Sequence, residues 1–400
     1  MRPDELRALG DRTLFERLKK DRLVRRTCEW LEEREEESPL RTRRQLLATA
    51  VRLTPGMAPG VHKIIDRCRE ALAVAIPLEV YVYSSPQFNA ACVKPEQGRL
   101  FILLSSSLLE GFRGRELDFV IGHELGHYVF GHHDIPIGVI AKGKERPRPE
   151  LLLQLFSWSR YAEISADRAG AHCAQDPDAV ATALFRLSSG LRTDLVTVRL
   201  DEFAAQIDDM MEDSSGDPAA RAKSSDWFST HPFSPLRVQA LQRYAESVLV
   251  KEGGESVAEL EAHIATLMAL MEPSYLDEKT DTAELMRRTL FAGAIAVANA
   301  DGAISEAEVE VIRDLFGHHA FSDRLNIDAI AQNLTHRVEE MNERVAPPRK
   351  VQVIRDLCLV VRAEGAVDQP GRRILEALAE QLEVPAAVVS QTLAAQAELD

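Results

Sequence analysis

The sequence lacks three features that would place it in a membrane, secreted or nucleic-acid-binding class. No window approaches the ~20 uninterrupted apolar residues of a transmembrane helix, so we expect no membrane span. The start, MRPDELRALGD, has no basic segment followed by an apolar one, so we expect no secretory signal. An excess of positive charge is also missing. The formal net charge of -15 disfavours binding to nucleic acid through its phosphates.

Cysteine is scarce and is never arranged as CxxC. The five cysteines are odd in number and widely scattered along the chain. This pattern is typical of reduced thiols or small core residues rather than of a disulfide framework, and it indicates a reducing compartment. We therefore predict a cytoplasmic protein. The cysteines are Cys28, Cys68, Cys92, Cys173 and Cys358.

The length of 400 residues suggests two or three domains. Residues 1–55 carry a charged, amphipathic pattern that ends near TPGMAPG, and they predict an N-terminal helical extension. Residues 56–250 form the predicted central domain, in which the polar stretch 208–226 predicts a surface loop. Residues 251–280, beginning with KEGGES, are the predicted linker, and residues 281–400 are almost wholly helical in pattern.

Local patterns in the central domain predict a small β-sheet followed by helices. PLEVYVYSS and GRLFILLSS predict neighbouring strands, joined by the turn-rich connection PQFNAACVKPEQG. From Glu116 the apolar residues recur at helical spacing, and a second helix is predicted from about Pro149. The predicted fold class is therefore mainly α, of the α+β kind, with a small sheet in the central domain and an all-α C-terminal domain.

The C-terminal third contains an internal repeat. AVANADGAISEAEVEVIRDL, residues 296–315, matches LVVRAEGAVDQPGRRILEAL, residues 359–378, at an offset of 63 residues. In each copy an acidic-Gly turn stands between two helical patterns. Two such copies predict a pseudo-symmetric helical domain.

The strongest chemical signal is HExxH, formed by His123, Glu124 and His127 on a predicted helix. Four residues make about 400° of helical rotation, so both imidazoles leave the same face and can share one zinc ion. Glu124 lies beside them, where it can activate a water at the zinc. The apolar surroundings strengthen this interpretation, because His and Glu side chains are costly to bury without a partner.

Two residues compete to be the third zinc ligand. His133 lies ten residues after His123, the spacing of the metzincin pattern HExxHxxGxxH, but Phe130 occupies the position of the required glycine. The other candidate is Glu163 in YAEISADRAG, with Asp167 one helical turn further on. A carboxylate ligand from a second helix, followed by an acid that orients a ligand histidine, gives a gluzincin type of site. We favour Glu163, and His133 remains the alternative.

Residues from about 55 to 245 resemble the HtpX-like and CAAX-prenyl-protease-like family of zinc endopeptidases. Order and spacing agree over nearly half of the chain. The resemblance implies a zincin-like fold and one catalytic Zn²⁺ ion. The matching stretches are EVYVYSSPQFNAACVKP, LFILLSSSLLEGFRGRELDFVIGHELGHYVFGHH, RYAEISADRAGAHCA and STHPFSPLRVQAL.

The resemblance also implies a role for each site residue. Glu124 is the implied general base, and Asp167 is implied to orient a ligand histidine without binding the metal itself. The implied zinc ligands are His123, His127 and Glu163.

Two further roles come from the resemblance alone. His231, in THPFSPLR, matches a histidine that stabilises the oxyanion, and Arg237 matches its basic partner. Many relatives also carry a membrane hairpin after the HExxH helix. Here the apolar part of that region is only IPIGVIA, which favours a soluble peptidase.

The C-terminal domain resembles the TerB-like domain of tellurite-resistance and stress proteins, which implies an interaction or sensing module. NADGAISEAE is also similar to part of an EF-hand loop that ends on Glu308. The first ligand position is then Val297, which cannot coordinate, and the second copy has Gly371 in place of the final acid. We favour a structural turn that caps two helices, while weak metal binding through Asp301 and Glu308 stays open.

Together these features predict a zinc metalloendopeptidase of the EC 3.4.24 type that hydrolyses peptide bonds in protein or peptide substrates. The predicted partners include neither nucleic acid nor a membrane. The alternative is a stress-response scaffold or metal-sensing protein in which the peptidase domain is latent.

Overall fold

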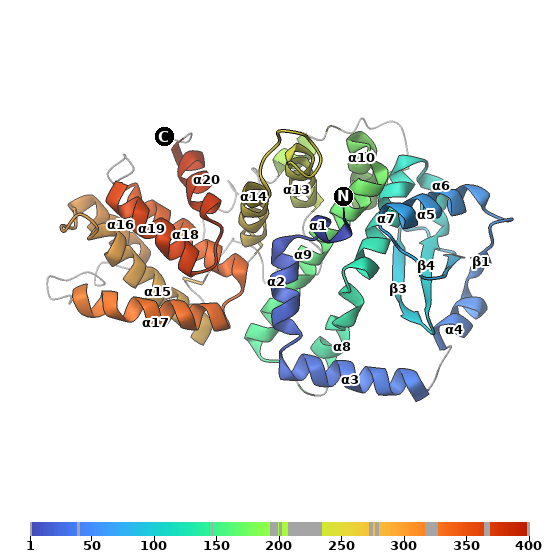
Figure 1. Ribbon diagram of the computed structural model, residues 1–400, viewed down its shortest axis with the longest axis horizontal. Helices are drawn as coiled ribbons and strands as arrows, with labels where there is room; N and C mark the ends of the chain where they lie inside the picture. The colour runs from blue at the N-terminus through green and yellow to red at the C-terminus, as the bar shows by residue number, and fades with distance from the viewer. Residues whose placement is uncertain are drawn as a thin grey trace. The chain divides into compact units, whose positions relative to one another are not determined.

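The computed structural model divides the chain into two compact units (Figure 1). Unit 1 comprises Met1–Arg148, Trp158–Asp213 and Thr230–Gly254, and unit 2 comprises Pro149–Ser157, Ser214–Ser229 and Glu255–Asp400. The predicted domain boundaries stay a prediction. No helix in the described part of the chain is long and apolar enough to cross a membrane. The structure describes residues 2–37, 41–143, 145, 147–192, 199, 202–206, 234–271, 275–276, 280–316, 327–363 and 369–397.

Unit 1 begins with the helices that the charged, amphipathic pattern predicts. On α2 the apolar side chains of Leu14, Phe15 and Leu18 recur at helical spacing and are buried. Asp11 lies on the same face and is fully buried, an unusual position for an acid. The helices are α1 (Pro3–Leu6), α2 (Leu9–Leu18), α3 (Arg22–Glu37) and α4 (Arg41–Thr49).

A four-stranded sheet follows, in the order β1-β2-β4-β3. Strands β2 (Leu78–Tyr83) and β4 (Arg99–Ser105) are parallel neighbours, which confirms the predicted pair. Strand β1 (Val51–Leu53) pairs antiparallel with β2 at the first edge.

Strand β3 (Ala90–Glu96) forms the other edge of the sheet and pairs antiparallel with β4. The prediction of a mere turn-rich connection here was wrong. Pro95 obscured the strand, because proline is rare in strands, but an edge strand tolerates it. Gln97 and Gly98 both have positive φ, 50° and 67°, and they make the tight turn into β4.

Helices pack around this sheet, and α7 and α9 begin close to the predicted positions (Figure 1). Helix α7 packs against α5, α10 and strand β3. The helices are α5 (Pro59–Ala71), α6 (Ser106–Gly111), α7 (Arg115–Val129), the 3₁₀ helix η1 (His132–Asp134), α8 (Ile137–Lys142), α9 (Pro149–Ala174), α10 (Pro177–Ser189) and α13 (Ser234–Glu246).

Glycines allow α7 and α9 to approach each other closely. A Cβ atom on Gly126 would lie 2.8 Å from Cβ of Ala169, and one on Gly122 would lie 2.7 Å from Cβ of Cys173. Both distances are shorter than real Cβ contacts, so a side chain at either position would force the helices apart. The close approach brings the HExxH face of α7 against the acids of α9.

Unit 2 is all helical and confirms the predicted repeat. Helix α18 ends 63 residues after α15, at 361 against 298, and α19 begins 63 residues after α16, at 369 against 306. Buried aliphatic side chains from these helices form one core. The predicted linker contains α14, which packs on α18 and α20 within this unit. The helices are α14 (Val257–Ala269), α15 (Asp281–Ala298), α16 (Glu306–Phe316), α17 (Ile327–Arg344), α18 (Pro347–Val361), α19 (Gln369–Gln381) and α20 (Ala386–Ala397).

Candidate metal centre

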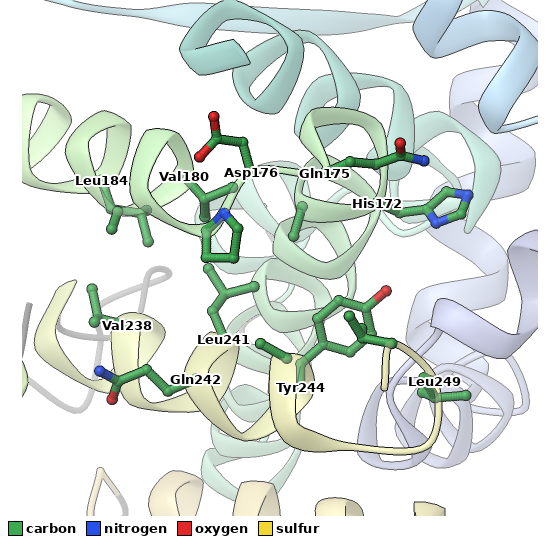
Figure 2. A pocket seen from close by; sticks show the side chains of 15 residues that line it. His172, Gln175, Asp176, Val180, Leu184, Val238, Leu241, Gln242, Tyr244 and Leu249 are labelled. Carbon is green, nitrogen blue, oxygen red and sulfur yellow. The ribbon is translucent and has the colours of Figure 1, made fainter. Parts of the chain in front are cut away.

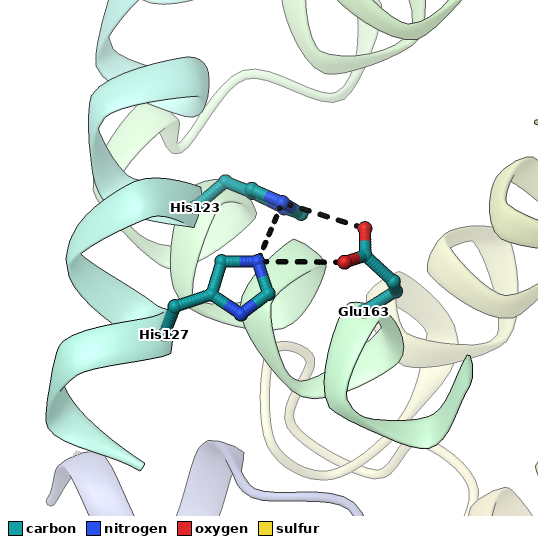
Figure 3. Close-up of side chains that lie close together, drawn as sticks. All are labelled: His123, His127 and Glu163. Atoms are coloured by element: carbon teal, nitrogen blue, oxygen red, sulfur yellow. Dashed lines mark hydrogen bonds and ion pairs between the residues drawn. The ribbon is translucent and has the colours of Figure 1, made fainter. Parts of the chain in front are cut away.

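The two histidines of HExxH lie one turn apart on α7 and point to the same side. Their Nε2 atoms are 3.1 Å apart. The side chains are 12% and 17% exposed, so both rings are largely withdrawn from water but still reachable. Figure 3 shows His123 and His127 converging on a carboxylate from α9. Two imidazole nitrogens facing each other at this distance are typical of a pair that shares a cation.

That carboxylate belongs to Glu163. One of its oxygens lies 3.6 Å from Nε2 of His123, and the other lies 3.5 Å from Nε2 of His127. Zinc bonds of about 2.0–2.2 Å in a tetrahedron place ligand atoms about 3.3–3.6 Å apart, so the three groups fit one zinc ion. Within the described residues, they are the one group of three or more His, Cys, Asp or Glu side chains close enough to hold a metal.

Asp167 and Arg237 stand behind the first histidine. Nδ1 of His123 lies 2.9 Å from Oδ1 of Asp167, which leaves Nε2 to face the metal position. Arg237, on α13, donates to both oxygens of Asp167 at 2.8 and 2.6 Å. Burial opposes a charged carboxylate, but the charge and hydrogen bonds of Arg237 together with His123 outweigh it and lower the pKa of Asp167.

The two ligand histidines differ in their electrostatic surroundings. Burial lowers the pKa of His123, but the hydrogen bond and charge of Asp167 outweigh it and raise that pKa above its ordinary value. Burial holds the pKa of His127 well below the ordinary value, because Glu163 only partly compensates. Uncharged His127 therefore keeps a lone pair for a metal at neutral pH.

Glu124 is held by the edge strand of the sheet. Its Oε2 accepts a hydrogen bond of 2.8 Å from the backbone N–H of Cys92 on β3. Burial raises the pKa of Glu124 above its ordinary value, with His123 acting in the opposite direction. A raised pKa suits a carboxylate that must take up a proton during a reaction.

The remaining predicted residues lie elsewhere. His133 is in η1 and outside the three-residue group, and burial lowers its pKa to about 4. His231 and the predicted loop 208–226 lie outside the described residues.

Asp301 lies in the turn before α16, and Glu308 lies in the first turn of that helix. There Glu308 accepts from the backbone N–H of Ser305 at 2.9 Å, and Ser305 accepts from the backbone N–H of Glu308 at 3.3 Å. This reciprocal pair is a capping box, the structural turn that the sequence favours. Asp301 accepts from the backbone N–H of Ala303 at 3.1 Å.

Two residues that the sequence reasoning missed lie behind His127. Its Nδ1 is 2.8 Å from Nδ1 of His132, and Nε2 of His132 is 3.0 Å from Oδ2 of Asp11. Sequence reasoning assigned no role to His132. Asp11 gave one signal, because it falls on the apolar stripe of α2, where a charged residue requires a partner.

A separate pocket of about 390 Å³ lies among α9, α10 and α13 (Figure 2). Its lining is largely apolar and includes Leu184, Leu241 and Tyr244. None of the three candidate ligands lines it. The pocket is therefore distinct from the metal centre.

Comparisons with known proteins confirm both resemblances. Residues 56–141 and 150–245 match the model of peptidase family M48, and residues 287–393 match that of tellurite resistance protein TerB. One part of the chain is thus similar to peptidase family M48 and another part to TerB. No solved structure matches the chain.

Curated relatives with metallopeptidase or protease names match about half of the chain. The plastoglobule-localized metallopeptidase 48, chloroplastic, of Arabidopsis thaliana is 29% identical over 218 residues, which cover 51% of this chain and 62% of that protein. A protease HtpX homolog of Gemmatimonas aurantiaca is 26% identical over 47% of this chain and 76% of its own length. The homolog of Pelotomaculum thermopropionicum is 25% identical, with the same coverage.

Proposed function

We propose that this chain, as a protein with an HtpX-like metallopeptidase part, is a zinc-dependent endopeptidase acting on protein or peptide substrates. The observation that carries the proposal is the convergence of three donor atoms from α7 and α9 at distances that suit one zinc ion. The proposed ligands are His123, His127 and Glu163. A bound zinc ion would supply Lewis-acid polarisation of the scissile carbonyl and of a water molecule.

The side chains of the site then have separate roles in peptide hydrolysis. Glu124 takes a proton from the attacking water and delivers it to the leaving amine. Asp167 holds His123 in the orientation that exposes its Nε2, and Arg237 keeps Asp167 ionised. His231 is proposed, from the family resemblance, to stabilise the oxyanion.

Zinc stoichiometry of the purified protein tests the ligand set. We expect one zinc ion per chain in the parent, and its loss in Glu163→Ala. His133→Ala serves as the control, because His133 is the competing third ligand and lies outside the group. Zinc that survives Glu163→Ala but disappears in His133→Ala would replace the proposed site with a metzincin-like one.

For the C-terminal part we propose an interaction or sensing module that binds a protein partner. The repeated helix–turn–helix arrangement and the TerB match support this role. Weak metal binding at Asp301 and Glu308 is proposed as a secondary property, testable by Ca²⁺ titration of the parent and of Asp301→Asn. A scaffold with a latent peptidase is the second candidate function. Equal cellular phenotypes for the parent and Glu124→Gln would favour it.

We also propose a cytoplasmic location. All five cysteines are unpaired, and four of them are buried, as in a protein that stays in a reducing compartment. Cell fractionation with an antibody against the chain tests this location, and recovery in an oxidising compartment would contradict it.

A further inference from the structure

His127, the second proposed ligand, contacts another imidazole directly and a carboxylate only through it. Nδ1 of His127 lies 2.8 Å from Nδ1 of His132, so one of these nitrogens donates and the other accepts. If His127 binds a metal through Nε2, its proton must sit on Nδ1, and His132 must accept. The proton of neutral His132 then sits on Nε2, which lies 3.0 Å from Oδ2 of Asp11. One tautomer of each ring satisfies every contact.

Asp11 is built into this position by helix α2. The carboxylate is fully buried, and it accepts from Nε1 of Trp158 at 2.9 Å and from Oγ of Ser165 at 2.8 Å. Arg7, one turn earlier on the chain, reaches both oxygens at 2.9 and 3.0 Å. Burial raises the pKa of Asp11, but His132 and Arg7 outweigh it and hold the pKa well below its usual range. Asp11 is therefore an anion.

Helix α2 is itself fixed on α9, the helix that carries the third proposed ligand. A Cβ atom on Gly10 would lie 2.3 Å from the ring of Tyr161, so the backbone of α2 is in close contact with α9. The backbone N–H of Ala8 also donates to Ser165 at 3.0 Å. The position of Asp11 is thus set by contacts that do not involve His132.

We propose that Asp11 and His132 are positioning residues for the metal ligand His127, and that the N-terminal helix α2 completes the metal centre. His123 meets the carboxylate of Asp167 directly, whereas His127 reaches the carboxylate of Asp11 through one intervening imidazole. Each ligand is thereby fixed in the tautomer that presents Nε2 to the metal. This inference rests on the zinc site proposed above.

The test compares Asp11→Asn with Asp178→Asn in the full chain. Asparagine keeps the size of Asp11 and an oxygen that accepts from His132, but it removes the charge. We expect Asp11→Asn to bind Zn²⁺ about tenfold more weakly in competition with a chelator, as is typical of residues that support a metal ligand. We also expect the visible absorption of its Co²⁺ form to change. Asp178→Asn makes the same change in the first turn of α10, away from the relay, and should keep the parent Zn²⁺ affinity and Co²⁺ spectrum.

Variants at His132 give an independent measurement and replace the first pair if Asp11→Asn fails to fold. His132→Asn retains a carbonyl oxygen that can accept from His127, whereas His132→Phe retains no acceptor. We expect the Zn²⁺ affinity to fall more in His132→Phe than in His132→Asn.

Each outcome of these measurements decides a separate question. A folded Asp11→Asn with parent Zn²⁺ affinity and Co²⁺ spectrum overturns the inference. So does an equal loss of affinity in Asp178→Asn, which would show that the loss does not depend on the contact with His132. If Asp11→Asn does not fold, equal Zn²⁺ affinities in His132→Asn and His132→Phe overturn it. A parent protein that binds no Zn²⁺ contradicts the proposed function itself.

Discussion

At the scale of single residues, the candidate metal centre depends on the side chains that form hydrogen bonds with its proposed ligands. Asp167 is 1% exposed and binds both His123 and Arg237. A buried carboxylate in this position fixes the ring orientation of the histidine and strengthens its donation to a metal. Removing its charge should therefore weaken metal binding without removing a ligand.

We predict that Asp167→Asn lowers the Zn²⁺ affinity about 10–100-fold. The neutral amide no longer stabilises the ligand histidine, and it leaves Arg237 without its charged partner. Chelator competition on the purified protein measures the change. Asp178, in the first turn of α10 and away from the site, provides the control, and Asp178→Asn should bind Zn²⁺ as the parent does. Equal affinities in the parent and Asp167→Asn would exclude this role.

Spacing along the chain reveals some of these residues and hides others. His123 and His127 follow from the helical period alone, because four residues return to the same face. Glu163 was favoured by its spacing to Asp167 on a second helix, but His133 stayed an alternative until the fold was known, since an acid on a helix is common. Asp11 and His132 are 121 residues apart, and no local pattern joins them. Their contact exists only because α2 packs on α9.

At the scale of elements, the distance between α7 and α9 sets the geometry of the site. Gly126 is part of HExxH on α7 and faces Ala166 and Ala169 of α9. The helical pattern predicted both helices, but it did not predict their close approach. That approach depends on which positions lack a side chain.

We predict opposite effects for two Gly→Ala substitutions. Gly126→Ala places a methyl group 2.8 Å from Cβ of Ala169 and should lower the free energy of unfolding by about 1–3 kcal/mol and weaken Zn²⁺ binding. Gly138→Ala, on α8, meets nothing within 4 Å and should raise the stability by about 0.5–1 kcal/mol, because alanine favours helix. Denaturant unfolding measures both. A stabilised Gly126→Ala would contradict the close packing of α7 and α9.

Helix α4 is joined to the sheet by an ion pair to a half-buried acid. Glu79 on β2 is 10% exposed and binds Arg43 of α4 at 3.0 Å. Tyr81 donates a hydrogen bond of 2.7 Å to the same carboxylate. Burial raises the pKa of Glu79, but Arg43 and Tyr81 outweigh it, so the pKa is lowered in the folded protein. The resulting stabilisation is complete above the ordinary glutamate pKa and is lost as the pH falls through the lowered value.

We predict that Glu79→Gln lowers the free energy of unfolding by about 1–2 kcal/mol at pH 7. The difference from the parent should shrink as the pH falls below about 4.5, because the parent carboxylate then becomes neutral as well. Glu110→Gln is the control, since Glu110 is 74% exposed and its removal should change stability by less than about 0.5 kcal/mol. Denaturant midpoints measured from pH 7 to pH 3.5 test this. A difference that grows on acidification would refute it.

At the scale of the whole molecule, the chain joins a unit that carries the candidate metal centre to an all-helical one. The repeat and the mainly α fold class were predictable, because period and offset are visible in the sequence. Strand β3 was not, because Pro95 masks it, and the role of α2 was not, because a charged helical pattern resembles a solvated surface helix. Sequence patterns and the family resemblance therefore pointed to the proposed ligands and to Asp167, whereas packing alone revealed Asp11 and His132.

We predict that zinc removal loosens one unit only. Amide hydrogen exchange should increase on α2, α7 and the part of α9 around Glu163, because a ligand that binds the folded state stabilises it. Exchange on α15 and α18 of unit 2 should not change. Adding Zn²⁺ back should restore the protection. Equal loss of protection in both units, or no loss on α7, would contradict a metal site confined to unit 1.

The most direct test of the central claim is Glu124→Gln, measured for both zinc content and cleavage of casein. The substitution leaves the three proposed ligands in place, but the glutamine side chain cannot accept the proton of the attacking water. We predict one zinc ion per chain in both proteins, cleavage by the parent, and a loss of cleavage of at least about 100-fold in the variant. A variant that binds zinc and cleaves casein as fast as the parent would contradict the proposed peptidase mechanism.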